Sequence, residues 1–298
     1  MGLIDRAIGA VTGADKGAVP GKIVALDGLK PLDIDLDALR AKGVFTPAAR
    51  EEAQAYELRA IKRRLLRRIG FLQRAGRDKR QLAAAGRNRN IILLTSTRPG
   101  EGKSFVAVNL AMSLAQEEGI PVFLIDGDPA RPRLRSYFNL GPDRGLIDLI
   151  RDPALTLGAV AFKAVGLPLT FIGEGSKVPN PTDVLGSLEA KRFFASLSAL
   201  CPDGLVIIDA PPMLATTETI ALARHADEVI FVVEADSTPQ SAIASALDEL
   251  LELNSNVSLL LNRCLVPAGG SHYAAYEYYE KRSGDDGDAA ARDRGSVK

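Results

Sequence analysis

The chain has 298 residues, 46% of them hydrophobic, and its 37 basic residues balance its 37 acidic ones. This length suits one large α/β domain or two small ones with a sizeable core. No apolar run approaches the ~20 residues of a membrane span, and the first residues are too polar for a signal peptide. The two cysteines, Cys201 and Cys264, lie far apart and lack metal-ligand spacing. We therefore expect a globular cytoplasmic protein without a disulfide framework.

The N-terminal part divides into two segments. Residues 1–50 mix Gly, Pro, Ala and Asp without sustained periodicity, and we expect a loosely ordered leader there. Residues 51–89 contain a basic helical segment followed by a linker, with the helical pattern running from about residue 48 to residue 82.

The basic helical segment has an apolar face that includes Leu58, Leu65 and Ile69. Its other positions are rich in arginine, as at Arg63 and Arg67. Such a face could contact anionic lipid, a nucleic acid or an acidic partner, and it could equally be a solvated helix surface.

Residues 90–267 alternate strand and helix signals. The expected strands are 91–95, 122–126, 169–172, 205–209, 229–233 and 258–261, and the expected helices are 106–118, 145–151, 190–200, 217–223 and 240–253. Short strands rich in Val, Ile and Leu indicate a doubly wound, mostly parallel sheet with helices on both faces. Residues 268–298 have little apolar content, and we expect them to be disordered.

The segment TSTRPGEGKS, from Thr95 to Ser104, lies between an apolar strand and a helix. A strand, a glycine-containing turn that ends in Gly-Lys-Ser, and a helix form a phosphate-binding loop, or Walker A motif. Glycine lets the backbone N–H groups turn towards phosphate oxygens, the lysine reaches the β- and γ-phosphates, and the serine hydroxyl binds Mg²⁺. The residues expected to bind the nucleotide are Pro99, Gly100, Glu101, Gly102, Lys103, Ser104 and Phe105. The motif departs from the usual pattern at Thr97, where a glycine is expected.

Aspartates end two further strands. Asp126 and Asp128 close the strand VFLID, and Asp209 closes the strand LVIID before Ala-Pro-Pro. In a doubly wound sheet these strand ends meet at the ligand crevice. A carboxylate there can hold Mg²⁺, and a second carboxylate can accept a proton from an incoming hydroxyl. The alternative is that these aspartates only cap the following helices.

The combined motifs resemble the bacterial tyrosine kinases (BY-kinases) of exopolysaccharide systems, which are built on a P-loop NTPase fold. The resemblance covers about residues 91–263. It rests on Ser96, Pro99 to Ser104, the Asp-x-Asp of Asp126 and Asp128, and the Asp-x-Pro-Pro that begins at Asp209.

This resemblance implies an ATP- and Mg²⁺-dependent protein-tyrosine autokinase that regulates exopolysaccharide chain length. Catalysis would involve Lys103, Asp126, Asp128 and Asp209, with Asp126 as the base for the tyrosine hydroxyl. Mg²⁺ would be held by Ser104, Asp128 and Asp209, and Asn262 would join the nucleotide site. The sites of autophosphorylation would be Tyr273, Tyr276, Tyr278 and Tyr279, which are four of the six tyrosines in the chain.

The resemblance also implies partners. They are a membrane-spanning chain-length regulator that activates the kinase, a protein-tyrosine phosphatase, and further copies of this chain, with no nucleic acid. The basic helix could add peripheral association with the inner face of the plasma membrane. The oligomerisation motif of the family, Glu-x-x-Arg-x-x-Arg, is altered here to Tyr56, Arg59 and Lys62.

Two other functions remain open at this point. One is a nucleotide switch of the partition or septum-site ATPase type, although Arg98 occupies the position of the lysine that marks those proteins. The other is a regulatory subunit that binds ATP without transferring phosphate.

Overall fold

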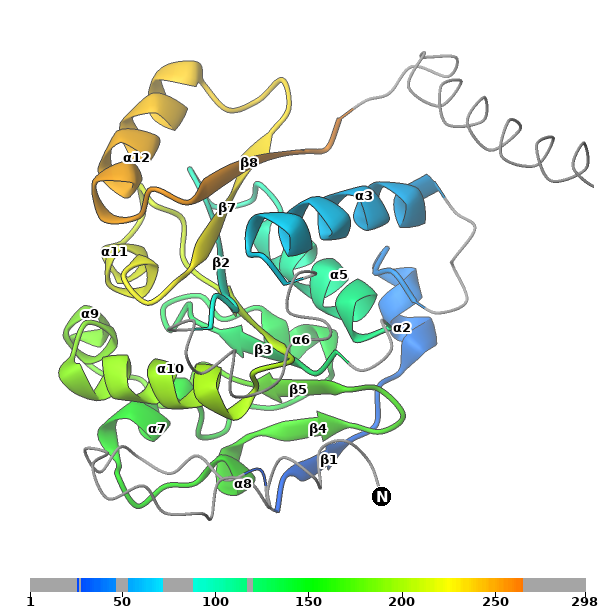
Figure 1. Cartoon of the computed structure of the whole chain (residues 1–298), viewed down its shortest axis with the longest axis vertical. Helices are drawn as coiled ribbons and strands as arrows, with labels where there is room; N and C mark the ends of the chain where they lie inside the picture. The colour runs from blue at the N-terminus through cyan, green and yellow to red at the C-terminus, as the bar shows by residue number, and fades with distance from the viewer. Residues whose placement is uncertain (1–25, 27, 47–52, 72–87, 117–119, 265–298) are drawn as a thin grey trace, which may run out of the picture. The chain divides into compact units, whose positions relative to one another are not determined.

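The structure, a computed structural model, describes residue 26 and residues 28–46, 53–71, 88–116 and 120–264 (Figure 1). The chain divides into two units, Met1–Asn262 and Arg263–Lys298. The strands and helices of the described residues belong to the first unit. The four tail tyrosines lie outside the described residues.

An eight-stranded sheet forms the centre of this unit, in the order β1-β4-β5-β3-β6-β2-β7-β8. All neighbouring strands are parallel except β4 and β5, which are antiparallel. The strands are β1 (Lys30–Leu32), β2 (Ile91–Ser96), β3 (Val122–Asp126), β4 (Phe162–Ala164), β5 (Leu169–Ile172), β6 (Leu205–Asp209), β7 (Glu228–Glu234) and β8 (Val257–Asn262).

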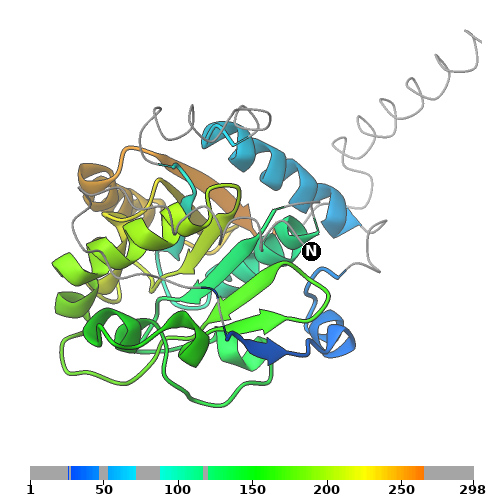
Figure 2. The same cartoon turned by 60° about the horizontal axis from the view of Figure 1, so that its bottom comes forward.

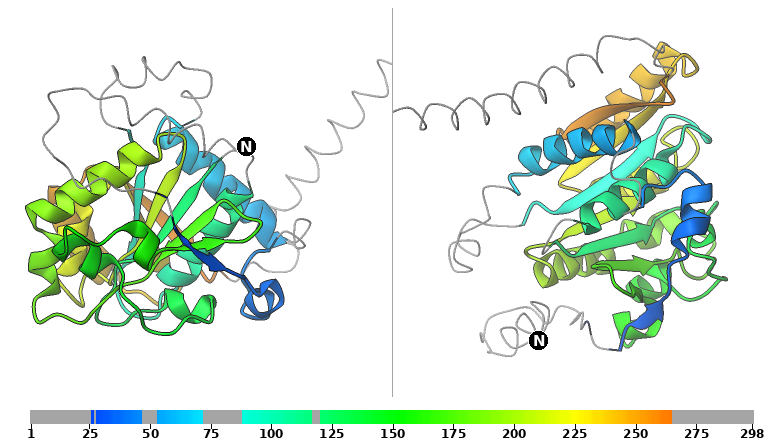
Figure 3. Two further views of the ribbon diagram at one scale, coloured as in Figure 1. Left: turned by 90° about the horizontal axis from the view of Figure 1, so that it is seen from below. Right: turned by 90° about the vertical axis from the view of Figure 1, so that its right-hand side faces the viewer.

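Helices cover both faces of the sheet, each over its own hydrophobic cluster. One face carries α7 (Leu146–Arg151), α8 (Leu157–Val160), α9 (Pro181–Leu185), α10 (Leu188–Leu200), α11 (Glu218–Ala223) and α12 (Gln240–Leu253). The other carries α2 (Leu36–Ala41), α3 (Ala53–Arg68), α5 (Lys103–Ala115) and α6 (Leu134–Tyr137). Figure 2 turns the β1 end of the sheet forward, and Figure 3 shows α10 and α3 on opposite sides of the strands.

The predicted doubly wound sheet is confirmed, and each predicted strand is present with ends within one residue. The reason is the uniform burial of the central strands: every residue of β2, β3 and β6 is buried. A strand enclosed on both faces has to be apolar throughout, which makes it conspicuous in a sequence. The long helices α5 and α10 start three and two residues earlier than predicted.

The prediction of a loosely ordered leader is wrong for residues 28–46. This stretch contributes β1, which pairs with β4, and α2, whose Leu39 is fully buried. Val44 and Phe45 are buried as well. The expected start of the domain at residue 90 is also wrong, since β1 is a strand of the same sheet. A three-residue strand and a six-residue helix are too short to show a hydrophobic period.

The basic helix is confirmed between Ala53 and Arg68, and residues 72–82 of the longer expected helix lie outside the described residues. Leu58, Leu65 and Ile69 are buried, as the apolar face predicted. Arg63 and Arg67 are exposed. No helix in the described ranges is long and apolar enough to cross a membrane.

Leu39→Ala should lower the free energy of unfolding by about 2–4 kcal/mol, because it leaves a cavity where a fully buried side chain packed. Leu36→Ala is the matched control on the same helix, since Leu36 is 38% exposed, and it should cost less than about 1 kcal/mol. Urea unfolding measures both. Equal effects would show that α2 is not part of the folded core.

Candidate active site

The phosphate loop joins β2 to α5 at the carboxyl edge of the sheet. Gly100 and Gly102 have φ angles of 97° and 92°, in the left-handed region that favours glycine. A Cβ atom at Gly102 would also overlap the side-chain amide of Asn262. Since α5 begins at Lys103, its first N–H groups and the positive end of its dipole lie at this loop. These features suit a bound phosphate.

Glu101 fixes the shape of the phosphate loop from inside. Its carboxylate accepts hydrogen bonds from Arg98 N (2.8 Å) and from the Thr238 hydroxyl (2.6 Å). Its carbonyl oxygen accepts a third bond from Asn262 Nδ2 at 2.9 Å. Asn262, expected in the nucleotide site, therefore lies beside the loop and supports it, together with Thr238, which the sequence did not single out.

Phe105 was also expected to bind the nucleotide. Its ring instead packs against the hydrophobic cluster on the α5 side of the sheet and faces Gly43. This residue can therefore offer a phosphate only its backbone N–H group.

Lys103 lies between two of the predicted aspartates. Its Nζ is 3.3 Å from Asp128 Oδ2 and 3.5 Å from Asp209 Oδ1. All three side chains are buried. The structure thus brings the phosphate-loop lysine together with the ends of β3 and β6, as the motif pattern predicted.

Asp209 has unused capacity to bind a cation. Neither of its buried oxygens accepts a hydrogen bond of full geometry from the residues that the structure describes. Burial raises the pKa of Asp209, while Lys103 and the neighbouring Ser104 hydroxyl favour its charged form. A buried carboxylate with free lone pairs beside a serine hydroxyl suits Mg²⁺.

The site offers few protein ligands for such a metal. Among the described residues, no group of three or more His, Cys, Asp or Glu side chains could hold an ion. This fits Mg²⁺, which usually takes one or two carboxylates and completes its shell with water and substrate phosphates. Ser104, Asp209 and Asp128 are the residues that would hold it.

Asp126 holds the following loop in shape. Its Oδ1 accepts a hydrogen bond from Asp128 N (3.1 Å), and its Oδ2 accepts bonds from Arg133 N (3.1 Å) and Leu134 N (2.9 Å). Its side chain has no exposed surface. Burial raises the pKa of Asp126 to about 8, with a further contribution from the charge of Asp209. Asp126, the predicted base, therefore also anchors the loop that carries Asp128.

Two more charged side chains join this edge of the sheet, and the sequence did not identify them. Arg135 and Glu174 form a buried ion pair, with Nε and Oε2 2.9 Å apart. Arg135 follows the Asp126 loop, and Glu174 follows β5. Gly173 and Gly175 flank Glu174, and they were the only signal in the sequence that this turn is crowded.

The fold and the site define a P-loop nucleotide-binding protein. Residues 92–265, more than half of the chain, match the family of the CobQ/CobB/MinD/ParA nucleotide binding domain. The expected P-loop NTPase fold is thereby confirmed.

Similar proteins narrow the class further. The tyrosine-protein kinase YwqD of Bacillus subtilis is 30% identical over 67% of this chain and 81% of its own length. EpsB of Ralstonia nicotianae is 31% identical over 70% of this chain, which spans only 28% of that relative. Among solved structures, the BceF tyrosine kinase domain is 27% identical, with a TM-score of 0.57 over 79% of this chain and 93% of that one. The chain belongs to the bacterial tyrosine-protein kinases.

The pKa of Asp126 gives a testable dependence of stability on pH. Without Mg²⁺ and nucleotide, the folded chain keeps a proton on Asp126 up to about pH 8, whereas the unfolded chain releases it near pH ~3.9. The free energy of unfolding should therefore fall as the pH rises between these values, and the stabilisation is complete only below the unfolded pKa.

Asp126→Asn removes this titration, so its free energy of unfolding should depend less on pH than that of the parent protein. Urea unfolding at about pH 5 and pH 8 compares the two slopes. Asp203→Asn, at an exposed carboxylate, is the control. Equal slopes in the parent and the Asp126→Asn variant would contradict the assignment.

Proposed function

We propose that this protein is an ATP- and Mg²⁺-dependent protein-tyrosine autokinase that regulates exopolysaccharide biosynthesis and chain length. The observation that carries the proposal is Lys103, whose Nζ lies 3.3 Å and 3.5 Å from the carboxylates of Asp128 and Asp209. One cation thus lies between a phosphate loop and two neighbouring strand ends, the parts that P-loop enzymes use to hold phosphates and Mg²⁺.

The residues of the site have separate roles in phosphoryl transfer. Lys103 turns from the carboxylates to the β- and γ-phosphates when ATP binds, while the loop N–H groups hold the phosphate oxygens. Ser104 and Asp209 would hold Mg²⁺, and that ion would supply positive charge next to the phosphates. The tyrosine oxygen then attacks the γ-phosphorus, the bond to ADP breaks, and the hydroxyl proton passes to a carboxylate.

Asp128 is the better candidate for that carboxylate. Both oxygens of Asp126 accept backbone N–H bonds, whereas Oδ2 of Asp128 is engaged only by Lys103 among the described residues. Withdrawal of Lys103 to the phosphates would leave that oxygen available. We propose that Asp126 shapes the loop and that Asp128 receives the proton or shares the metal.

The acceptors of the proposed reaction are Tyr273, Tyr276, Tyr278 and Tyr279. Each phosphate would add about −1.5 to −2 charges to the tail. The partners proposed with this function are a membrane chain-length regulator, a protein-tyrosine phosphatase and further copies of the chain, in the cytoplasm at the inner face of the plasma membrane.

The nucleotide-switch alternative shares the same family of nucleotide-binding domain. Arg98 argues against it, because those ATPases carry a lysine at this position. The similarity to YwqD also favours the kinase. Truncation after Pro267 separates the two, since a kinase loses its phosphotyrosine and a switch keeps its nucleotide turnover.

Lys103→Met should abolish phosphotyrosine on the purified protein incubated with ATP and Mg²⁺. Loss of the cation placed to reach the phosphates should slow transfer by about 1,000-fold or more. Mass spectrometry of the tail peptides measures the product, and Lys191→Met, at an exposed position on α10, is the control. Labelling that persists in Lys103→Met would refute the proposal.

Membrane association can be tested on the exposed arginines of α3. Replacing Arg63, Arg64 and Arg67 by glutamine should weaken binding to vesicles of phosphatidylcholine and phosphatidylglycerol by roughly 100-fold, at about 1 kcal/mol per charge. The matched control replaces three exposed arginines on the opposite face, Arg151, Arg192 and Arg224. Equal losses in a sedimentation assay would exclude α3 as the contact surface.

A further inference from the structure

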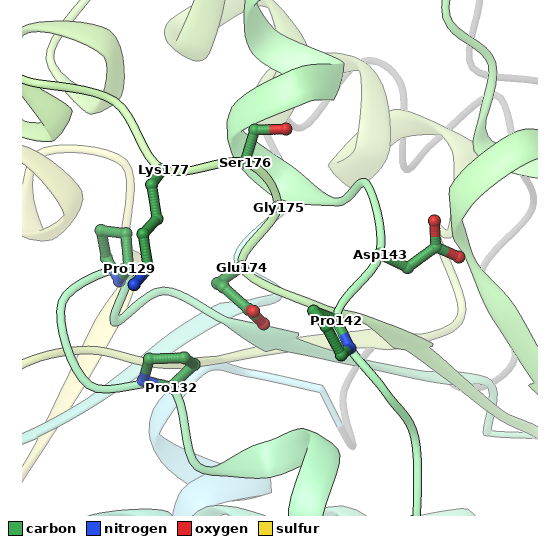
Figure 4. Close-up of a pocket in the computed structure, with 8 residues that line it drawn as sticks. All are labelled: Pro129, Pro132, Pro142, Asp143, Glu174, Gly175, Ser176 and Lys177. Atoms are coloured by element: carbon green, nitrogen blue, oxygen red, sulfur yellow. The ribbon is translucent and has the colours of Figure 1, made fainter.

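A small cavity of about 270 Å³ lies beside the Asp128 loop. Three prolines form its walls: Pro129, Pro132 and Pro142. Glu174 is directed into the space between them, and Lys177 lies at its rim next to Pro129 (Figure 4). The pocket thus combines apolar walls, a carboxylate at its base and a cation at its edge.

The base of this pocket is fixed by Arg135. Its guanidinium donates to Glu174 Oε2 at 2.9 Å and to the carbonyls of Gly141 (3.1 Å) and Asp143 (2.9 Å). One side chain therefore holds both Glu174 and the wall that carries Pro142. Glu174 is 8% exposed, and its other oxygen, Oε1, accepts no hydrogen bond from the part of the chain that the structure describes.

These features select the chemistry of a ligand. Proline rings offer flat apolar surfaces that suit an aromatic ring, and an apolar cavity of about 150 Å³ is enough for benzene. A carboxylate with a free oxygen needs a hydrogen-bond donor when a ligand displaces its water. A ring with a hydroxyl donor at its far end meets both requirements, and among protein side chains this is the phenol of tyrosine.

The position of the pocket relates it to the phosphate site. Asp209 and Asp126 are paired in register on β6 and β3, and Ile125 is paired with Ile172 on β5. Glu174, two residues past Ile172, therefore lies about two strand spacings from Asp209, or roughly 10 Å. Its charge is close enough to raise the pKa of Asp126.

We infer that this pocket docks an unphosphorylated tyrosine of the acceptor polypeptide while a second tyrosine of the same segment reacts beside Lys103. This inference rests on the proposed kinase function. A polyproline II segment rises about 3.1 Å per residue and repeats every three residues, so two tyrosines three positions apart lie on one side and span roughly the 10 Å between the two positions. The sequence places tyrosines at this spacing, as Tyr273 with Tyr276 and Tyr276 with Tyr279.

Docking would depend on the phosphorylation state of the tyrosine. A phosphorylated ring has lost its hydroxyl donor and carries about two negative charges, which Glu174 at the base repels and Lys177 at the rim attracts. The base of the pocket, which needs a donor for Glu174, therefore favours tyrosine over phosphotyrosine. As a tail accumulates phosphate, it should become a poorer acceptor.

The first test measures binding without any transfer. The probe is p-cresol, the side chain of tyrosine as a free molecule, observed by saturation-transfer NMR on the full chain. Glu174→Gln should weaken its binding about tenfold, the loss expected for one hydrogen bond to a charged group. Pro142→Ala, in an exposed loop, should also weaken it, and it serves as the second variant if Glu174→Gln does not fold. Pro202→Ala is the control, because Pro202 precedes the amino end of β6 and the pocket lies beyond the carboxyl ends of the strands.

The second test uses peptides of residues 271–277, Ser-His-Tyr-Ala-Ala-Tyr-Glu. For the parent peptide, Glu174→Gln should raise KM about tenfold, because a hydrogen bond to a charged group is lost in binding only. Pro142→Ala should raise KM as well, because it removes an apolar wall of the pocket. Neither variant should change kcat or the ATP affinity measured without peptide. Replacing one peptide tyrosine by alanine should raise KM for the other in at least one of the two peptides. Phosphorylating that docking tyrosine should have the same effect, and phenylalanine there should have a smaller one.

The outcomes separate this inference from the proposed function. Unaltered p-cresol binding in both pocket variants, or a KM indifferent to the second tyrosine, would overturn the docking site. A second outcome is that no peptide is phosphorylated, while p-cresol binds the parent protein and binds the pocket variants more weakly. That outcome would refute the kinase function and retain a phenol-binding site.

Discussion

The ammonium group of Lys103 connects the three strand ends on which the site depends. Lys103 is the first residue of α5, which follows β2, and its ammonium group contacts Asp128 after β3 and Asp209 at the end of β6. All three charges are buried, so removing one partner would leave an uncompensated charge inside the protein. In the proposed function, the phosphates of ATP would replace the carboxylates as partners of the lysine, and Mg²⁺ would replace the lysine as partner of the carboxylates. Each buried charge would then keep a partner when the lysine changes its contacts.

The burial of several charges at this site also explains why Asp126, at the start of the loop after β3, accepts several backbone hydrogen bonds. Asp126 and Asp209 face each other in register on adjacent strands. Burial raises the pKa of both, with a further contribution from the charge of Asp209 at Asp126 and from the charge of Asp128 at Asp209. Three backbone N–H groups on Asp126 offset part of this cost and fix the path of the loop towards Leu134. An arrangement that is unfavourable for stability is thereby maintained at a functional position.

The sequence predicted the parts of this site that lie within one short segment. It missed the contacts between residues that are far apart in the sequence. The strands β2, β3 and β6 are short apolar runs that end in chemically distinctive residues, so their place in the sheet could be inferred. The buried pair of Arg135 and Glu174 joins residues that are 39 positions apart, and no motif marks it. Leu39 and the strand β1 were missed for a similar reason, since their burial depends on β4 and α5 rather than on their own periodicity.

The loop from Asp126 to Arg135 gives these separate features a common mechanical basis. Asp126 anchors its start, Asp128 contacts the phosphate-loop lysine, and Arg135 at its end builds the proline-walled pocket. If Lys103 changes partners as proposed, Asp128 loses a contact at one end of this segment, while Arg135 holds Glu174 at the other end. Any coupling between nucleotide binding and acceptor docking would have to be reciprocal, so a docked acceptor could favour ATP only as far as ATP favours docking.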